Sequence, residues 1–134
     1  MKLIADAMLG RLARWLRLLG FDTLYHRDMG DNELLRLARR EGRTILTRDT
    51  HLLERCAAAC VFVRSEDLDE QLAQVVSELG LRPSRPGRCA NCNGSLRDVA
   101  EKAEVSGLVP DHVYLTHGRF TRCEGCGNVY WEGS

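Results

Sequence analysis

The sequence predicts an α/β protein built on a parallel sheet of βα units, followed by a small metal-binding module. Short apolar runs alternate with stretches of helical periodicity over about the first 80 residues, and an aspartate follows three of these runs. Near the C-terminus, four cysteines form two C-x2-C pairs. A segment rich in proline separates the two parts.

The expected strands and helices alternate regularly in the first part. Strands are expected at residues 2–5, 21–25, 44–47 and 60–64, and helices at residues 8–19, 31–41, 50–59 and 67–79. In the first helix, Gly20 is a stop signal after leucines that recur at helical spacing, namely Leu9, Leu12, Leu16 and Leu19. The fourth strand is a continuous apolar run, as expected when helices cover both faces of a parallel sheet.

Composition divides the chain into three segments. Residues 1–80 are expected to form the α/β domain, residues 81–88 a linker and residues 89–134 a zinc ribbon. The linker contains RPSRPGR at residues 82–88, with two prolines and a glycine. Within the ribbon we expect short strands at residues 113–115, 120–122 and 129–131, where β-branched and aromatic residues gather.

Four cysteines have the spacing of a zinc site. The two C-x2-C pairs are separated by 30 residues and consist of Cys89, Cys92, Cys123 and Cys126. Four thiolates complete a tetrahedral sphere, so we expect a structural Zn²⁺ and not a catalytic one. Two disulfides are the alternative, which the lack of a secretory signal disfavours. Cys56 and Cys60 have apolar neighbours and are interpreted as buried thiols.

Asp6, Asp31 and Asp49 each follow an expected strand, and their positions suggest a second metal site. The carboxyl ends of parallel strands lie at one edge of a sheet, where ligands bind. Carboxylates gathered there suit Mg²⁺ or Mn²⁺, which can activate a water and polarise a phosphodiester. Helix capping is the simpler alternative, because aspartate is favoured at N-cap positions. The two roles are compatible.

Arginine accounts for all but two of the 19 basic residues. A coding bias explains this as readily as phosphate recognition, for which the guanidinium fork is the better group. Arg11 and Arg14 follow the first of the three aspartates, and Arg48 directly precedes the third. These three arginines are candidates to bind substrate phosphates. A solvated helix face is the alternative for Arg14 and, more strongly, for Arg17.

The formal net charge of zero argues against binding to polyanions through bulk charge, although a local basic surface remains possible. No segment reaches the roughly 18 apolar residues of a membrane span, and the N-terminus does not resemble a signal peptide. We therefore expect a cytoplasmic protein without a membrane partner. Trp15 and Trp131 either stack on bases or fill a core. The oligomeric state has no signal in the sequence.

Four stretches carry a family resemblance. They are LIADAMLGRLARWLRLLG at residues 3–20, DNELL at 31–35, ILTRD at 45–49 and RCEGCGNVYWEG at 122–133. The first three resemble the Mut-seven C-terminal RNase-domain family of PIN-like proteins, and the fourth resembles the zinc ribbon of that family. The resemblance implies a PIN-like α/β fold and a divalent-metal-dependent ribonuclease, with Asp6, Asp31 and Asp49 as its acidic site. A fourth acidic residue is usual in PIN sites, and nearby candidates are Asp28, Glu33, Glu66, Asp67 and Asp69.

Two functions of different classes fit the sequence. The first is a ribonuclease with RNA as its partner, in which a metal-activated water attacks a phosphodiester while the ribbon grips the strand. The alternative is a non-catalytic RNA- or ribosome-binding module that needs Arg119 and Arg122 of the ribbon and tolerates the loss of Asp6. A phosphate-accepting receiver domain is excluded, because neither Lys2 nor Lys102 lies where its lysine is required.

Overall fold

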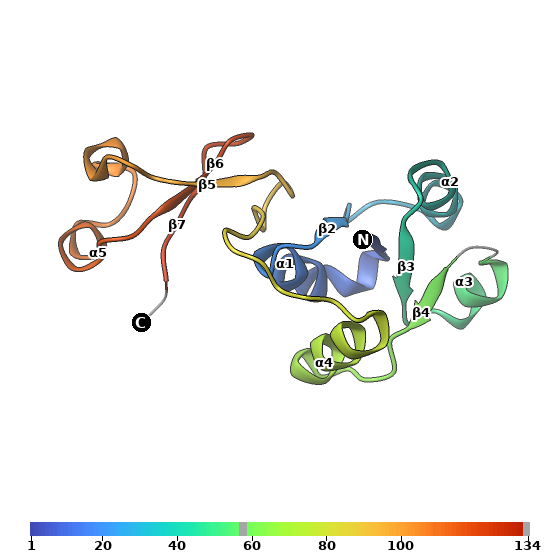
Figure 1. Cartoon of the computed structure of the whole chain (residues 1–134). Helices are drawn as coiled ribbons and strands as arrows, with labels where there is room; N and C mark the ends of the chain where they lie inside the picture. Colours follow the sequence, from blue (N-terminus) through green and yellow to red (C-terminus); the bar gives the residue numbers. More distant parts are fainter. Residues whose placement is uncertain (57–58, 133–134) are drawn as a thin grey trace.

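The computed structural model describes residues 1–56 and 59–132, which form two sheets (Figure 1). The larger sheet has four parallel strands in the order β2-β1-β3-β4, and this confirms the predicted α/β class with βα units. Its strands are β1 (Lys2–Ala5), β2 (Asp22–Leu24), β3 (Thr44–Thr47) and β4 (Cys60–Phe62). The helices of this part are η1 (Ala7–Leu9), α1 (Gly10–Leu18), α2 (Asp31–Glu41), α3 (Thr50–Arg55) and α4 (Leu68–Leu79). No helix in the described ranges is long and apolar enough to cross a membrane.

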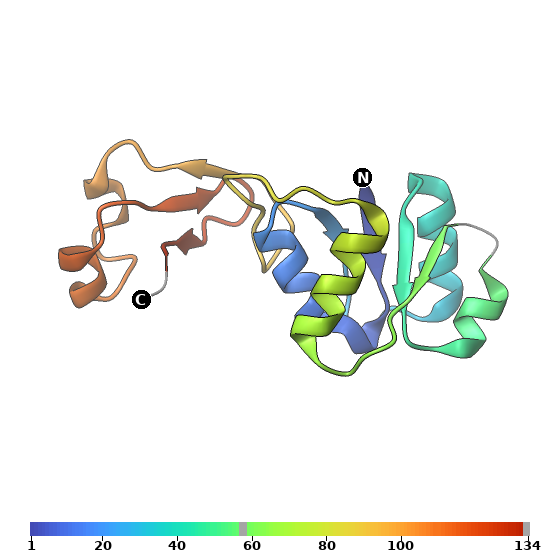
Figure 2. The same ribbon diagram turned by 60° about the horizontal axis from the view of Figure 1, so that its bottom comes forward.

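Two helices cover each face of the parallel sheet (Figures 1 and 2). One apolar cluster joins α1 and α4 to the strands and includes Leu3, Leu12, Leu16, Leu46 and Val75. The other joins α2 and α3 to the strands and includes Ile4, Leu34, Ile45 and Leu52. The consecutive residues of β1 and of β3 thus alternate between the two clusters, as the strand pleat requires. Both central strands are buried on both faces.

The direction of winding reverses between β1 and β3. The chain runs from β1 outward to β2 on one side, and from β3 outward to β4 on the other. β1 and β3 are parallel neighbours, with Ala5 opposite Leu46, so their carboxyl ends lie side by side. Such a topological switch point is where open α/β sheets bind ligands. Asp6 follows β1 at this point, and Arg48 and Asp49 follow β3.

Several elements have the predicted bounds, namely the strands at residues 2–5 and 44–47 and the helix at residues 31–41. The first helix begins differently, because the Asp6 carboxylate accepts a hydrogen bond from the amide of Met8 and starts a 3-10 turn before α1. The helix predicted at residues 50–59 ends at Arg55. Its predicted continuation through residues 57 and 58 lies outside the described residues.

The smaller sheet is antiparallel, in the order β5-β6-β7. It consists of β5 (Leu96–Asp98), β6 (Thr121–Cys123) and β7 (Val129–Tyr130), with η2 (Lys102–Val105) and α5 (Asp111–Thr116) between β5 and β6. The two short helices pack over a small core of Val105, Val109, Val113 and Phe120. We call this part, residues 89–132, the ribbon.

The prediction of a strand at residues 113–115 is wrong, because these residues lie in α5. Pro110 and Asp111 favour a helix start, and Val113 packs into the core of the ribbon. The β-propensity of the Val-Tyr-Leu run is a weak preference that this packing overrides. β5 was not predicted, because Leu96 is its one buried residue and two polar residues follow it.

A buried arginine holds the ribbon against the parallel sheet. The Arg17 side chain is only 5% exposed and donates to the carbonyl oxygens of Thr23 (2.8 Å) and Ala90 (2.9 Å). Ala90 lies between the first pair of cysteines, so Arg17 joins β2 to that cysteine turn. Burial lowers the pKa of Arg17, and nearby Cys89 and Cys92 oppose this shift. The interpretation of Arg17 as part of a solvated helix face is therefore wrong.

A second bridge joins the same two elements. The Asn93 side chain accepts a hydrogen bond from the amide of Thr23 (3.1 Å) and donates one to the carboxylate of Asp22 (2.7 Å). Asp22 also accepts from the Arg43 guanidinium (2.8 Å). Burial raises the pKa of Asp22, but the hydrogen bonds from Arg43 and Asn93 outweigh it and hold the pKa below its usual value. The carboxylate therefore stays charged at neutral pH.

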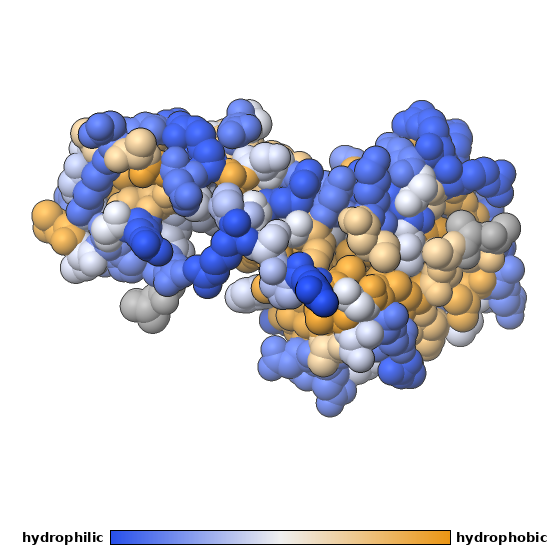
Figure 3. Space-filling model, in the orientation of Figure 1, coloured by the Kyte–Doolittle hydropathy of each residue, from blue (hydrophilic) through white to orange (hydrophobic). Residues whose placement is uncertain are grey.

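The segment between the two sheets packs along the C-terminal end of α1. The amide of Ser84 donates to the carbonyl of Leu19 (2.9 Å), and that of Arg88 donates to the carbonyl of Arg17 (2.7 Å). Gly87 approaches the end of α1 so closely that a Cβ atom would collide with the helix backbone. Beside this packed segment, the surface is hollowed between the ribbon and the parallel-sheet part (Figure 3).

Replacing Arg17 tests the bridge between the two parts. Arg17→Met leaves the carbonyls of Thr23 and Ala90 without their donor, so the free energy of unfolding should fall by about 2–4 kcal/mol. Urea unfolding measures this loss, and limited proteolysis should cut residues 81–88 faster in the variant. Arg14→Met, on the exposed side of the same helix, should change the free energy by less than about 0.5 kcal/mol. Equal losses in the two variants would contradict the bridge.

Candidate functional site

The four cysteines of the ribbon form one group of potential metal ligands. Their sulfur atoms all lie within 4.8 Å of one another. Cys89 and Cys123 are buried, whereas Cys92 and Cys126 are exposed. The sulfur atoms are 3.6 Å apart between Cys89 and Cys126 and 3.4 Å apart between Cys92 and Cys123, well beyond the disulfide length of about 2.05 Å. None of the four is disulfide-bonded.

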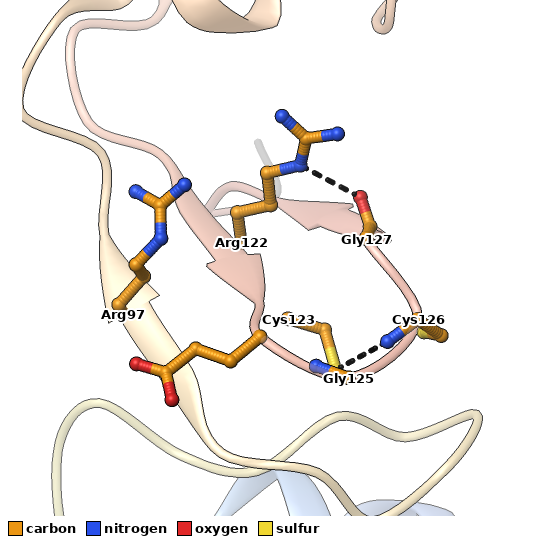
Figure 4. A pocket seen from close by; sticks show the side chains of 7 residues that line it. Arg97, Arg122, Cys123, Gly125, Cys126 and Gly127 are labelled. Carbon is orange, nitrogen blue, oxygen red and sulfur yellow. Dashed lines mark hydrogen bonds between the residues drawn. The ribbon is translucent and has the colours of Figure 1, made fainter.

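Backbone groups around the second pair favour a thiolate. The amides of Gly125 and Cys126 donate to the sulfur of Cys123, at 3.3 and 3.4 Å (Figure 4). Burial raises the pKa of Cys123, but these amides and Cys92 lower it to about 7. At Gly94 a Cβ atom would lie 2.9 Å from the same sulfur, so only glycine fits there. The four sulfur atoms can hold a metal such as zinc.

An open pocket of about 620 Å³ lies beside the second cysteine pair, and Arg97 and Arg122 line it (Figure 4). Both guanidinium groups pair with the carboxylate of Glu104. Nε of Arg122 also donates to the carbonyl of Gly127 (3.1 Å), which fixes the turn that carries the cysteines. Both arginines thus have partners within the ribbon, where they share one carboxylate.

Asp6 and Asp49 are connected at the switch point through Thr47. The Thr47 hydroxyl donates to Oδ2 of Asp6 and accepts from the amide of Asp49 (2.9 Å). Asp6 is only 5% exposed, and it also accepts from the amides of Met8 (2.9 Å) and Arg48 (3.4 Å). A carboxylate offers about four lone-pair sites, so three donors leave capacity for about one further partner.

Asp49 and Asp31 lie at the starts of helices. Asp49 is the N-cap of α3 and accepts from the amide of His51 (2.9 Å), whereas Asp31 is the first residue of α2. Within residues 1–56 and 59–132, the cysteines are the one group of three or more potential ligands within 4.8 Å, so Asp6, Asp31 and Asp49 do not form such a group. Capping accounts for the hydrogen bonds from Met8 to Asp6 and from His51 to Asp49, and a role in metal binding stays a prediction.

The three candidate arginines differ in their surroundings. Arg11 and Arg14 are exposed on α1, and neither forms an ion pair with any residue of the described ranges. Arg48 is half-buried. Its Nη1 donates to the carbonyl of Val63 (3.0 Å), and its Nη2 lies 3.7 Å from the Glu66 carboxylate. Arg11 and Arg14 are therefore the more available to a phosphate.

Comparison with known proteins gives a family for this chain. A sequence profile of the Mut7-C RNAse domain matches residues 1–134, the full length. The chain belongs to the Mut7-C RNAse domain family. The resemblance noted from the sequence motifs is thereby confirmed, and membership supports a ribonuclease-type function with RNA as the substrate class. Searches of curated proteins and of solved structures found no significant match.

Thr47 is the residue of the candidate acidic site that sequence reasoning missed. It is fully buried at the end of β3 and links two of the three predicted acidic residues. The sequence signal for Thr47 was its position two residues before Asp49, because a hydroxyl there can accept a hydrogen bond from a nearby backbone amide. A threonine in an apolar strand run otherwise resembles an ordinary β-former.

The two remaining cysteines of the Mut7-C chain lie away from the ribbon. Cys56 and Cys60 are half-buried and pack against the cluster under α2 and α3. Burial, a hydrogen bond that the Cys60 thiol donates to Cys56 and the charge of Asp6 together raise the pKa of Cys60 to about 12. Cys60 is therefore a neutral thiol at physiological pH, which agrees with a structural role, although neither residue is fully buried as predicted.

Metal analysis tests the cysteine site. Protein purified without chelator should contain about one zinc ion per chain, because four thiolates complete its coordination. Cys123→Ser removes one of the two buried ligands and should lower the zinc content to near zero. Cys56→Ser removes a cysteine outside the group and should leave the zinc content unchanged. Zinc retained in full by Cys123→Ser would show that the four cysteines are not its ligands.

Proposed function

We propose that this protein is a divalent-metal-dependent ribonuclease that hydrolyses RNA phosphodiesters at the carboxyl edge of its parallel sheet. The observation that supports this most directly is the position of Asp6. It is a nearly buried carboxylate at the topological switch point, in a chain of the Mut7-C RNAse domain family. Burial of a carboxylate is costly, so one kept at a ligand-binding edge calls for a functional explanation besides capping.

Asp6, Asp31 and Asp49 would hold Mg²⁺ or Mn²⁺ in this proposal, because these hard cations prefer carboxylate oxygens. When bound, such an ion would polarise the phosphodiester and lower the pKa of a bound water. Thr47 fixes the orientation of Asp6 through its hydroxyl. Glu66, which lies near Arg48 at the same edge, is the candidate for a fourth acidic group.

The arginines of the same edge would bind the substrate backbone. Arg11 and Arg14 are exposed on the helix that follows Asp6, and their guanidinium groups can each donate two hydrogen bonds to a phosphate. Arg48 would orient a phosphate with the donors that Val63 and Glu66 leave available. The cysteine group would hold a structural zinc ion that keeps the ribbon folded.

A non-catalytic RNA- or ribosome-binding module is the second candidate. One observation favours it: the carboxylates of Asp6 and Asp49 already accept hydrogen bonds as helix caps. In that case Asp6 would serve the fold alone, and RNA binding would not depend on its charge. The two candidates therefore differ in what neutralising Asp6 does to cleavage.

Asp6→Asn separates the two candidates. The amide retains an oxygen for the Met8 cap but offers a weaker metal ligand, so Mn²⁺-dependent cleavage of RNA should fall at least about 100-fold. The free energy of unfolding should fall by only about 1 kcal/mol, because an amide is a weaker hydrogen-bond partner than a carboxylate for the Thr47 hydroxyl. Cleavage is followed on a labelled oligoribonucleotide. The control is Asp111→Asn, which neutralises an exposed carboxylate in the first turn of α5 and should leave cleavage unchanged.

Cleavage at the wild-type rate by Asp6→Asn would favour the binding module over the ribonuclease. The same conclusion would follow if wild-type protein bound RNA but cleaved none with Mg²⁺ or Mn²⁺ present.

Arg11→Ala tests the phosphate contacts. Removing one phosphate contact should weaken RNA binding and reduce the salt dependence of the affinity by about one unit of slope, because fewer counterions are released. Mn²⁺ affinity should be unchanged. Fluorescence anisotropy across a salt series measures the slope. Arg39→Ala is a matched control, since Arg39 is exposed on α2. Equal losses in the two variants would mean that RNA is not held specifically along α1.

A further inference from the structure

A groove of about 810 Å³ lies between α1, the segment that joins the sheets and the ribbon. Trp15 and Leu18 of α1 form one wall, and Phe120 and Trp131 of the ribbon form another. The space-filling view shows the molecule hollowed between the same two parts (Figure 3). Concave surfaces of this size with aromatic walls, at the junction of two structural units, are typical ligand sites. We call it the tryptophan groove.

The walls of the tryptophan groove are held in fixed positions. Arg17 and Asn93 bind the ribbon to β2, and the hydrogen bond from Ser84 to the carbonyl of Leu19 holds the floor on α1. The Trp131 ring packs edge-on against Phe120, with centroids 6.4 Å apart, and Phe120 is itself buried. A site whose walls are ordered in advance loses less entropy when it binds a ligand.

Both tryptophans of the chain line this groove, and both are accessible. Trp15 is 47% exposed and Trp131 is 36% exposed. The interpretation of these residues as core tryptophans is therefore not supported by the structure. Two exposed indole rings in one preformed groove provide flat apolar faces on which planar, uncharged groups can stack. Nucleobases are such groups, and every base has a face to offer.

The charges of the groove favour bases over phosphates. Its lining contains two arginines and two carboxylates, and one of each, Arg85 and Glu132, form an ion pair with each other. The net charge of the lining is therefore close to zero, which would not attract a polyanion by itself. Arg119, the other arginine, forms no ion pair with any described residue.

The cationic groups lie along α1, which connects the groove to the acidic edge. Arg11, Arg14 and Trp15 are exposed and spaced three and four residues apart, so they share one face of the helix. The nine residues of α1 span about 13 Å, from the switch point at its start to the groove near its end. A nucleic-acid strand bound along this face would place its phosphates against the arginines and its bases against the tryptophans.

We propose that the tryptophan groove binds unpaired bases of a single-stranded RNA segment whose backbone continues along α1 to the acidic edge. The identity of this occupant rests on the proposed ribonuclease function. Stacking on Trp15 and Trp131 requires bases that are splayed out of a helix, which a fully paired duplex does not provide. The protein therefore selects single-stranded RNA over duplex RNA before any chemistry takes place.

The intrinsic fluorescence of the protein reports on this groove, because both tryptophans line it. Full-length protein carrying Asp6→Asn, without added Mg²⁺ or Mn²⁺, is titrated with a single-stranded oligoribonucleotide and with a blunt duplex of the same sequence. The single strand should quench the fluorescence and the duplex should not. In anisotropy measurements, Trp15→Ala and Trp131→Ala should each weaken single-strand binding about tenfold or more.

Two further variants serve as controls. Trp15→Phe keeps an aromatic face and should recover most of the affinity, which a merely structural role of the ring would not require. Leu115→Ala removes an exposed apolar side chain of α5 outside the groove and should leave the affinity unchanged. Circular dichroism and urea unfolding of each variant establish that the fold is retained.

Wild-type affinity in both tryptophan-to-alanine variants would overturn the proposal, and so would equal affinity for duplex and single strand. Self-association that Trp15→Ala abolishes, without any effect on RNA, would assign the groove to a second copy of the chain and would also overturn it. Failure of the ribonuclease proposal is distinguishable: tryptophan-dependent binding of single strands without cleavage supports the groove alone. Cleavage that is independent of both tryptophans overturns the groove and leaves the ribonuclease proposal standing.

Discussion

The guanidinium of Arg17 is the most deeply buried charged group that connects the two halves of the protein. It lies almost out of contact with water, where unpaired donors are costly, and two of its N–H groups donate to the carbonyls of Thr23 and Ala90. Burial lowers its pKa, and Cys89 and Cys92 oppose this shift and so favour its charged form. The first cysteine turn is thus a docking surface as well as part of the candidate zinc site. Loss of order in that turn would remove partners of Arg17, which couples the metal site to the position of the ribbon.

The acidic edge illustrates how one residue can serve the fold and a ligand site together. A strand that ends at the carboxyl edge of a parallel sheet leads directly into a helix, so an aspartate at the junction is well placed to cap that helix. Parallel strands also bring several such junctions to one edge. Asp6 and Asp49 occupy neighbouring junctions and are joined by Thr47. Capping fixes their carboxylates in place, which a metal site also requires.

The position of the ribbon determines which surfaces could act together on a nucleic acid. α1 presents Arg11 and Arg14 near the switch point and Trp15 at the groove. The ribbon contributes Trp131, and the packed segment at the end of α1 sets its distance from the helix. Along one helix, the charged surface therefore begins near the switch point and the aromatic surface adjoins it at the groove. Such a division suits a flexible strand, whose backbone and bases can be contacted at different places.

The parallel sheet of βα units and the group of four cysteines could be predicted from the sequence alone. Apolar periodicity and cysteine spacing report on local structure, and burial of both sheet faces leaves few alternative arrangements. Four features are visible only in the folded chain: Arg17 is buried, Thr47 links two aspartates, residues 113–115 are helical, and both tryptophans line one groove. Each of these depends on contacts between residues distant in the sequence, or on packing that outweighs local preference. The one-dimensional pattern of a helix face does not show which of its arginines a second module will cover.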